Sequence, residues 1–143
     1  MPVDPVAISR SALDVEWQRM QIVAQNLANE NTTSLDSKGR YIPLSLNSGP
    51  DGGFGGLVAG GDRAGAPMGV RVVSIQARSD PFRRVHDPSH PAADAAGFVS
   101  YPNIDHAAEM IALMRSARTY ESNLTALSLA QQMAMRALDI GRR

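Results

Sequence analysis

The sequence contains no cysteine, which excludes a disulfide framework, a thiolate metal site and a cysteine nucleophile. Aromatic residues are scarce, with one Trp, three Tyr and three Phe, so they add little to any core. No apolar run approaches the roughly 18 residues that a membrane span needs. The first residues, MPVDPVAISR, also lack the apolar run of a secretory signal peptide. If the protein acts outside the cytoplasm, we therefore expect it to leave without a cleavable signal peptide.

The sequence also has no excess of positive or negative charge, because 14 Lys and Arg residues balance 14 Asp and Glu residues. That balance disfavours a protein that binds nucleic acid or an anionic membrane through bulk electrostatics. The length of 143 residues suits about one domain. Alanine and methionine are plentiful instead of aromatics, as is typical of closely packed helices.

The N-terminal residues predict a helix over 5–29. Asp4 can cap the free amide groups, and Pro5 fits the first turn. A first apolar stripe has the 4-3-4-3 spacing of a coiled coil. It consists of Leu13, Trp17, Met20, Ala24 and Leu27. We expect a second stripe beside it, made of Ile8, Ala12, Val15 and Ile22. Asparagines at 29–31 favour a cap or a left-handed residue at the helix end.

The C-terminal residues predict a longer helix over 105–140, capped by Asp105 and stopped by Gly141. At 1.5 Å per residue, about 35 residues give roughly 50 Å of helix. Its apolar stripe again has 4-3 spacing. The stripe consists of Leu113, Ala117, Tyr120, Leu124, Leu127, Gln131, Ala134 and Leu138.

The middle of the chain has a different character. Residues 49–69 are rich in glycine and predict a flexible loop. The β-branched run 69–75 predicts a strand, 98–101 predicts another, and 41–46 predicts a weaker one that Pro43 interrupts. The Asp-Pro and His-Pro pairs between 80 and 91 predict turns.

These elements predict a mainly α fold with a small β-rich insert, in which long coiled-coil-forming terminal helices pack together. The expected division is 1–33 plus 103–143 as a terminal-helix core, and 34–102 as the insert. One antiparallel helix pair leaves apolar surface uncovered, so we expect further copies to cover it through heterologous contacts. The alternative is a monomeric helical hairpin with a β flap.

Residues 25–32, QNLANENT, resemble the signature at the end of the N-terminal helix of flagellar rod, hook and distal-rod proteins. Residues 80–105, DPFRRVHDPSHPAADAAGFVSYPNID, are similar to the stretch before the C-terminal helix of a proximal rod protein. Residues 115–124, RSARTYESNL, are similar to the arginine-tyrosine-glutamate-x-asparagine pattern of axial C-terminal helices. The three blocks stand in the family's order, while 34–69 matches no motif of the family.

The matching positions of this flagellar axial family motif are Asn26, Leu27, Ala28, Asn29, Asn31, Thr32, Pro81, Phe82, Asp87, Pro88, Pro102, Asn103, Tyr120, Glu121 and Asn123. The resemblance implies a structural subunit that polymerises in the proximal rod, in the periplasmic part of the flagellar basal body. It also implies export by the flagellar type III apparatus and contacts with other proximal rod proteins, the distal rod protein and the hook-basal-body adaptor.

Both helical stripes supply the residues that we expect at subunit contacts. They are Leu13, Trp17, Met20, Leu27, Leu113, Tyr120, Leu124, Leu127 and Leu138. The terminal helices would form the inner layer and 36–100 a small outer part. The rival from another class is a soluble coiled-coil adaptor or export-chaperone-like module that binds one partner and does not polymerise.

Enzyme chemistry has little support in the sequence. His86, Asp87 and His90 would suit a metal only on a helix, which Pro88 and Pro91 disfavour, so we interpret them as turn residues. Arg83 and Arg84 favour a subunit contact over nucleic acid, and Arg115 and Arg118 can pair locally with Glu121. The glycine run lacks the Gly-Lys-Ser/Thr of a phosphate loop. We predict no catalytic residue, cofactor, metal, nucleic acid or small-molecule substrate.

Overall fold

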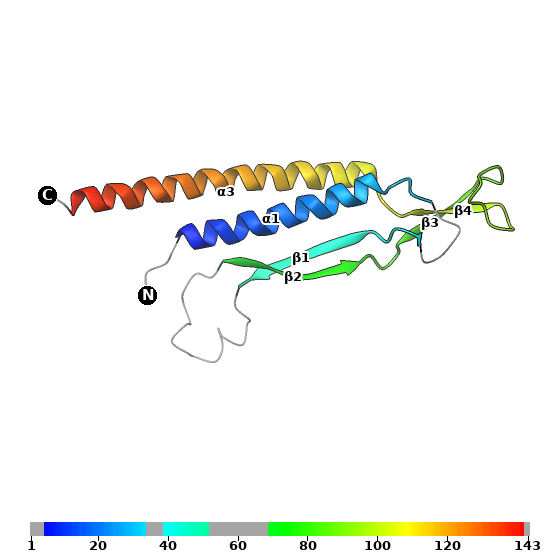
Figure 1. Ribbon diagram of the computed structural model, residues 1–143, viewed down its shortest axis with the longest axis horizontal. Coiled ribbons are helices and arrows are strands. Elements are labelled where there is room, and N and C mark those ends of the chain that lie inside the picture. Colours follow the sequence, from blue (N-terminus) through cyan, green and yellow to red (C-terminus); the bar gives the residue numbers. More distant parts are fainter. Residues whose placement is uncertain (1–4, 34–38, 52–68, 142–143) are drawn as a thin grey trace, which may run out of the picture. The chain divides into compact units, whose positions relative to one another are not determined.

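The computed structural model describes residues 5–33, 39–51 and 69–141. Along the described chain, four strands follow the first helix and precede the second, in the order α1 (Pro5–Ala28), β1 (Leu44–Pro50), β2 (Val70–Ala77), β3 (Phe82–His86), β4 (Phe98–Pro102) and α3 (His106–Ile140) (Figure 1). The predicted mainly α fold with a small β part between two terminal helices is therefore confirmed. In the described residues, neither helix has the length and apolar character that crossing a membrane requires.

The helix ends follow from local hydrogen bonds. Asp105 caps α3, since its Oδ1 accepts a bond from the Ala108 amide at 3.2 Å. After α1, the Asn29 side chain donates to the Gln25 carbonyl at 2.8 Å and accepts from the Thr32 hydroxyl at 3.2 Å. Asn29 therefore caps the helix as predicted. The left-handed conformation expected for an asparagine here is wrong, because every described residue with positive φ is a glycine.

Strands β1 and β2 form a two-stranded sheet. The Asp51 amide donates to the Gly69 carbonyl at 2.8 Å and the Arg78 amide to the Pro43 carbonyl at 3.0 Å, which is the pattern of antiparallel strands. The predicted strand 41–46 is displaced: it starts after Pro43, which has no amide hydrogen to donate, and continues through Gly49 and Pro50. The glycine-rich stretch thus begins within a strand, and its residues 52–68 lie outside the described residues.

Strands β3 and β4 form a second antiparallel sheet, with Phe82 opposite Pro102 and His86 opposite Phe98. The β4 strand was predicted, but β3 was not, since the sequence indicated turns throughout 80–91. The turns are confined to the segments around Asp80-Pro81 and after His86. The five residues between them contain no proline, so no backbone amide needed for pairing with β4 is missing.

The chain divides into two compact units, and both helices pass from one unit into the other. Unit 1 comprises 1–18, 48–73 and 115–143; unit 2 comprises 19–47 and 74–114. Unit 2 holds most of the buried apolar side chains: Ile22, Val23, Leu46, Val99 and Ile104. Among the described residues of unit 1 only Val15 and Ser116 are buried, so the other apolar side chains of its helical segments are exposed or half-buried.

Candidate functional site: an apolar assembly surface and a buried polar network

The nine predicted contact residues of α1 and α3 lie at the surface of the single chain. Trp17 is 54% exposed, Leu124 51% and Leu138 71%. The other six are half-buried: Leu13, Met20, Leu27, Leu113, Tyr120 and Leu127. Large apolar side chains in such positions are available to a partner.

The second α1 stripe faces the interior instead. Val15 and Ile22 are buried, whereas Trp17 is exposed. At about 100° per residue, Val15 and Trp17 project about 160° apart around the helix. The expectation that the two stripes lie side by side is therefore wrong, because buried Val15 projects from nearly the opposite side of the helix to Trp17.

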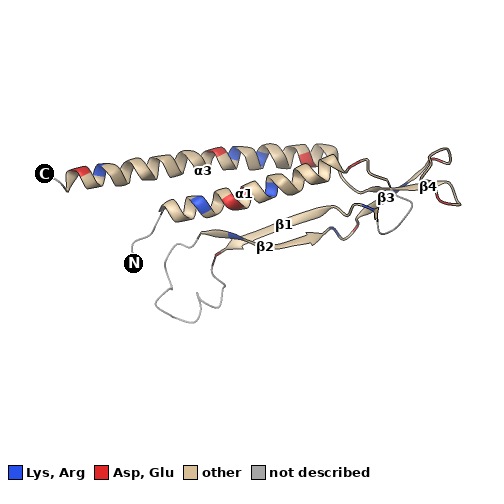
Figure 2. Cartoon of the chain, viewed as in Figure 1, with Lys and Arg blue, Asp and Glu red and all other residues tan. Residues whose placement is uncertain are grey.

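The C-terminal half of α3 combines exposure with an absence of charge. Residues 122–135, SNLTALSLAQQMAM, carry no charged side chain, and Figure 2 shows this part of α3 as an uninterrupted tan ribbon. Leu129, Met133 and Met135 are exposed there, and every residue over 131–140 is exposed. We call the exposed large apolar residues of α1 and α3 the assembly surface. They are Trp17, Met110, Ile111, Met114, Leu124, Leu129, Met133, Met135, Leu138 and Ile140.

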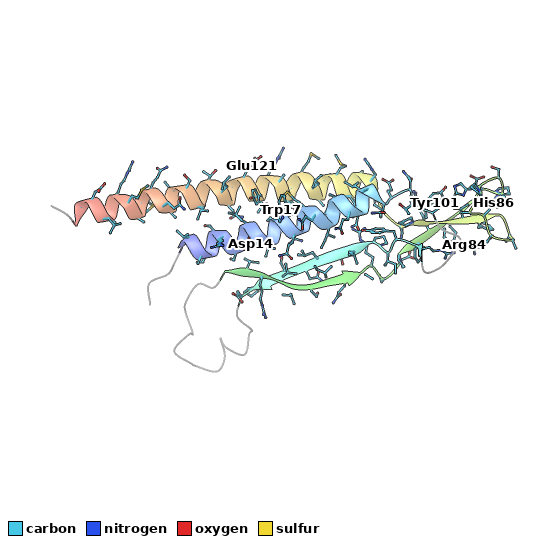
Figure 3. The ribbon with its side chains drawn as sticks, in the orientation of Figure 1. Asp14, Trp17, Arg84, His86, Tyr101 and Glu121 are labelled. Carbon is cyan, nitrogen blue, oxygen red and sulfur yellow. The ribbon has the colours of Figure 1, made fainter. Side chains whose placement is uncertain are left out.

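An open notch interrupts the assembly surface within unit 1. It has a volume of about 280 Å³ and is lined by Leu13, Asp14, Trp17 and Tyr120, from α1 and α3. Figure 3 shows Asp14 and Trp17 on α1, with Trp17 between the two helices. Three of the four residues were predicted contact residues; Asp14 was not, because a single exposed carboxylate on a helix gives no sequence signal.

Asn26 of the first motif block is fully buried, at 0% exposure. Its Nδ2 donates to the Leu44 carbonyl at 3.0 Å and to Glu109 Oε2 at 3.4 Å. Its Oδ1 accepts bonds from the Leu44 amide at 3.1 Å and from the Tyr41 hydroxyl at 2.8 Å. Asn26 therefore links α1, the start of β1 and α3 within unit 2.

Glu109 and Arg78 extend this network. Arg78 forms an ion pair with the buried Glu109 carboxylate, which also accepts the bond from Asn26. Burial and the nearby Glu109 charge raise the pKa of Tyr41, so its hydroxyl stays protonated and can donate to Asn26. Because each polar group of this network has a partner, the hydrogen bonds offset the cost of removing these groups from water and orient the elements that carry them.

The second motif block also makes structural contacts in unit 2. Asn103 donates from its side chain to the Asp80 carbonyl at 3.2 Å, and its amide donates to the Pro81 carbonyl at 2.8 Å. Pro102 is buried, and the Phe82 ring lies under the Arg40 guanidinium, 5.8 Å from the centroid. These bonds close the base of the β3–β4 hairpin.

The loop of this hairpin is held by two aspartates. Asp87 accepts bonds from the Ser89 hydroxyl at 2.7 Å and amide at 3.2 Å, which lower its pKa. Asp94 accepts bonds from the Phe98 and Ala96 amides, both at 2.9 Å, and these lower the pKa of Asp94. Sequence reasoning missed Asp94, although Asp94-x-x-Gly97 has the spacing of a type I turn with Gly at its fourth position.

The histidines and arginines that suggested other functions make local contacts. The His86 ring lies edge-on to Phe98 and the His90 ring edge-on to Tyr101, and His90 accepts a bond from the Ala92 amide at 3.0 Å. Arg83 lies over Tyr101 and Arg84 over Phe98, where Arg84 also pairs with Asp94 at 2.7 Å. Among the described residues, no three His, Asp or Glu side chains gather as a metal site would require.

The remaining motif residues are less constrained. Ala28 is exposed, so the chain's own packing does not explain its small size. Asn31 and Glu121 are exposed, and Pro88 lies against Gly97. The local pairing expected between Arg118 and Glu121 is wrong, because no ion pair joins them in the described part of α3.

Comparison with known proteins adds an independent finding. Residues 95–140 match the family model described as flagellar basal body rod FlgEFG protein C-terminal. The chain is 37% identical to the flagellar basal-body rod protein FlgC of Bacillus subtilis, over 94% of this chain and 95% of that protein. It is 31% identical to FlgC of Salmonella typhimurium and 30% identical to FlgC of Escherichia coli O6:H1, in each case over 94% of this chain and 93% of the relative.

These matches cover nearly the full length of both partners, so they include all three motif blocks and most of both terminal helices. Proteins of this kind are structural parts of the flagellar basal body and not enzymes. With its exposed apolar helices and its buried motif asparagine, the chain belongs to the FlgC family of flagellar basal-body rod proteins.

Proposed function

We propose that this protein is a subunit of the proximal rod and that its terminal helices polymerise into the drive shaft that transmits torque from the motor to the hook. The observation that carries the proposal is the exposed, charge-free stretch 122–135 of α3. A helix that exposes Leu124, Leu129 and Met133 around its circumference would be a poor surface for a monomer in water. Coiled-coil contacts between subunits would cover it.

The proposed arrangement places 1–33 and 103–143 in an inner helical layer and 34–102 in a smaller outer part. The nine contact residues, led by Trp17, Leu124 and Leu138, would lie between subunits of the inner layer. The exposed apolar side chains of α3, such as Leu124 and Leu138, support placing this helix between subunits. A shaft under torque needs many interlocked contacts, which methionine and leucine side chains can supply.

The family implies self-association and contacts with other components of the basal body. We propose that the partners are the other proximal rod proteins, the distal rod protein and the hook-basal-body adaptor at the rod base. We further propose that the chain reaches the periplasm through the flagellar type III export apparatus, without a cleavable signal peptide. Its family membership supports this route.

Deletion of the gene tests the proposed function. We expect non-motile cells whose purified basal bodies show membrane rings without rod or hook in electron micrographs, and we expect a plasmid copy to restore both. Intact basal bodies with a normal rod would overturn the proposal and favour the coiled-coil adaptor or export-chaperone alternative.

A further inference from the structure

The notch in unit 1 contains a carboxylate, whereas the surface around it is apolar. Asp14 places an exposed carboxylate beside the half-exposed indole of Trp17 and the phenol ring of Tyr120. Within the described residues, Asp14 has no ion-pair partner. The notch therefore offers a negative charge and two aromatic rings, and no cation of the described chain neutralises it.

This combination suits a guanidinium group. Arginine can place its flat face on an aromatic ring while its N–H groups donate to a carboxylate, and its aliphatic stem can lie along an apolar wall such as Leu13. Lysine lacks the planar group that stacks on an indole. The volume of about 280 Å³ is large enough for one long side chain and too small for a packed helix.

The same chain presents two suitable arginines, Arg115 and Arg118, which we call the arginine pair. Both are exposed on α3 in unit 1. Neither forms an ion pair among the described residues. Counting about 100° per residue from Tyr120, which lines the notch, Arg118 projects at about 160° and Arg115 at about 140° in the other direction. The arginine pair therefore lies on the face of α3 opposite the notch.

The two features also lie at nearly the same height along α3. Arg118 is two residues and Arg115 five residues from Tyr120, which is about 3 Å and 7.5 Å along the helix axis. Two copies standing side by side would thus bring the arginine pair of one copy to the notch of the next. Since notch and arginines occupy opposite faces, the contact is heterologous and can repeat from copy to copy.

We propose that the notch of Leu13, Asp14, Trp17 and Tyr120 receives a guanidinium from the arginine pair of an adjacent copy of this chain. The inference rests on the proposed function and adds to it a specific lateral contact. The aromatic and apolar wall excludes water from the pair, and the charges select one orientation of the two copies. An apolar surface alone would leave the copies free to slide past one another.

Cross-linking tests the contact directly, because the natural chain has no cysteine. Two differently tagged forms, Asp14→Cys and either Arg115→Cys or Arg118→Cys, are expressed together in the deletion strain, and isolated basal bodies are treated with a short bismaleimide. We expect a product that carries both tags and has twice the mass of the chain. Asp14→Cys mixed with Arg136→Cys, another exposed α3 position, is the matched control and should give none.

Charge exchange provides a second test if the cysteine variants do not assemble. Asp14→Arg alone and Arg115→Asp with Arg118→Asp should each abolish swimming without altering the circular dichroism of the purified chain. The triple variant should regain swimming, because the charges are then exchanged. Failure of the triple variant together with absence of the two-tag product would overturn the inference. If both tests fail but the deletion strain has no rod, the inference is wrong and the proposed function still holds. If the deletion strain has an intact rod, the proposed function is wrong as well.

Discussion

Asn26 shows what a single residue contributes in this fold. It sits in a motif whose other asparagines, Asn29 and Asn31, are at the helix end, and the sequence pattern does not distinguish them. In the structure Asn26 is buried with four hydrogen bonds, whereas Asn31 is exposed in a turn. Four groups, three from residues 41–44 and one from α3, therefore depend on one amide side chain.

Replacing Asn26 tests this role. Asn26→Ala would leave the Leu44 amide and carbonyl and the Tyr41 hydroxyl without their partner, and we expect the free energy of unfolding to fall by about 2–5 kcal/mol. Urea denaturation of the purified chain measures the change. Asn31→Ala is the matched control and should alter the free energy of unfolding by less than about 0.5 kcal/mol. Equal effects of the two substitutions would contradict the structural role of Asn26.

Asp94 permits a prediction about pH. Its pKa is lowered from the ordinary value of 3.8 by bonds from the Phe98 and Ala96 amides and from Arg84. A carboxylate with a lowered folded-state pKa stabilises the fold above its unfolded-state value, and this contribution disappears as the pH falls through the folded-state pKa. We expect the Phe98 amide resonance in NMR spectra to titrate with a midpoint below 3.8 and the hairpin to loosen there. The Asp94→Asn variant should lack this transition; a midpoint at or above 3.8 would show that the bonds do not favour the ionised form.

The β3–β4 hairpin illustrates what is decided at the scale of an element. Gly97 has a φ of 78°, in the left-handed region. A Cβ atom there would come within 3.2 Å of Pro88 Cβ and 3.3 Å of His86 Nε2. Both the turn and the packing therefore require glycine at this position.

We expect Gly97→Ala to destabilise the hairpin by about 1–2 kcal/mol, the strain of an L-residue in a left-handed conformation. Hydrogen exchange of the Val85 and Val99 amides should become faster. Gly141→Ala is the control: its added Cβ meets its nearest neighbour at 3.6 Å, and its φ is not positive, so exchange in the hairpin should stay unchanged. Unaltered protection in Gly97→Ala would mean that the loop can adopt another turn.

At the scale of the whole molecule, stability and assembly depend on different residues. Buried Val15 and Ile22 hold the chain together, while Leu124, half exposed on the charge-free part of α3, contributes to the assembly surface. Leu124→Arg should therefore leave the thermal unfolding of the monomer within a few degrees of the natural chain, because the new charge remains in water.

The same Leu124→Arg substitution should abolish rod assembly and motility, since a buried, unpaired charge at a helix contact typically costs several kcal/mol. Swimming in soft agar and electron microscopy of basal bodies measure the effect. Gln76→Arg, at an exposed polar position of β2 outside the charge-free stretch, is the control for added charge. Normal swimming of the Leu124→Arg strain would exclude α3 from the subunit contacts that we propose.

The sequence by itself determined both terminal helices, the caps at Asn29 and Asp105 and the family, because helix periodicity and capping residues are local and each of the three motif blocks is contiguous in the chain. The predicted Asp4 cap lies outside the described residues. The sequence also predicted β2 and β4, because both short segments are rich in β-branched or aromatic residues. It did not predict β3, the central role of Asn26 or the notch at Asp14. Each of these depends on segments far apart in the sequence: β3 on pairing with β4, Asn26 on Leu44 and Glu109, and Asp14 on Tyr120. Periodicity could find the apolar stripes of α1, but only the tertiary structure decided that Val15 and Ile22 face inward and Trp17 faces solvent, since either stripe could have been covered by the strands.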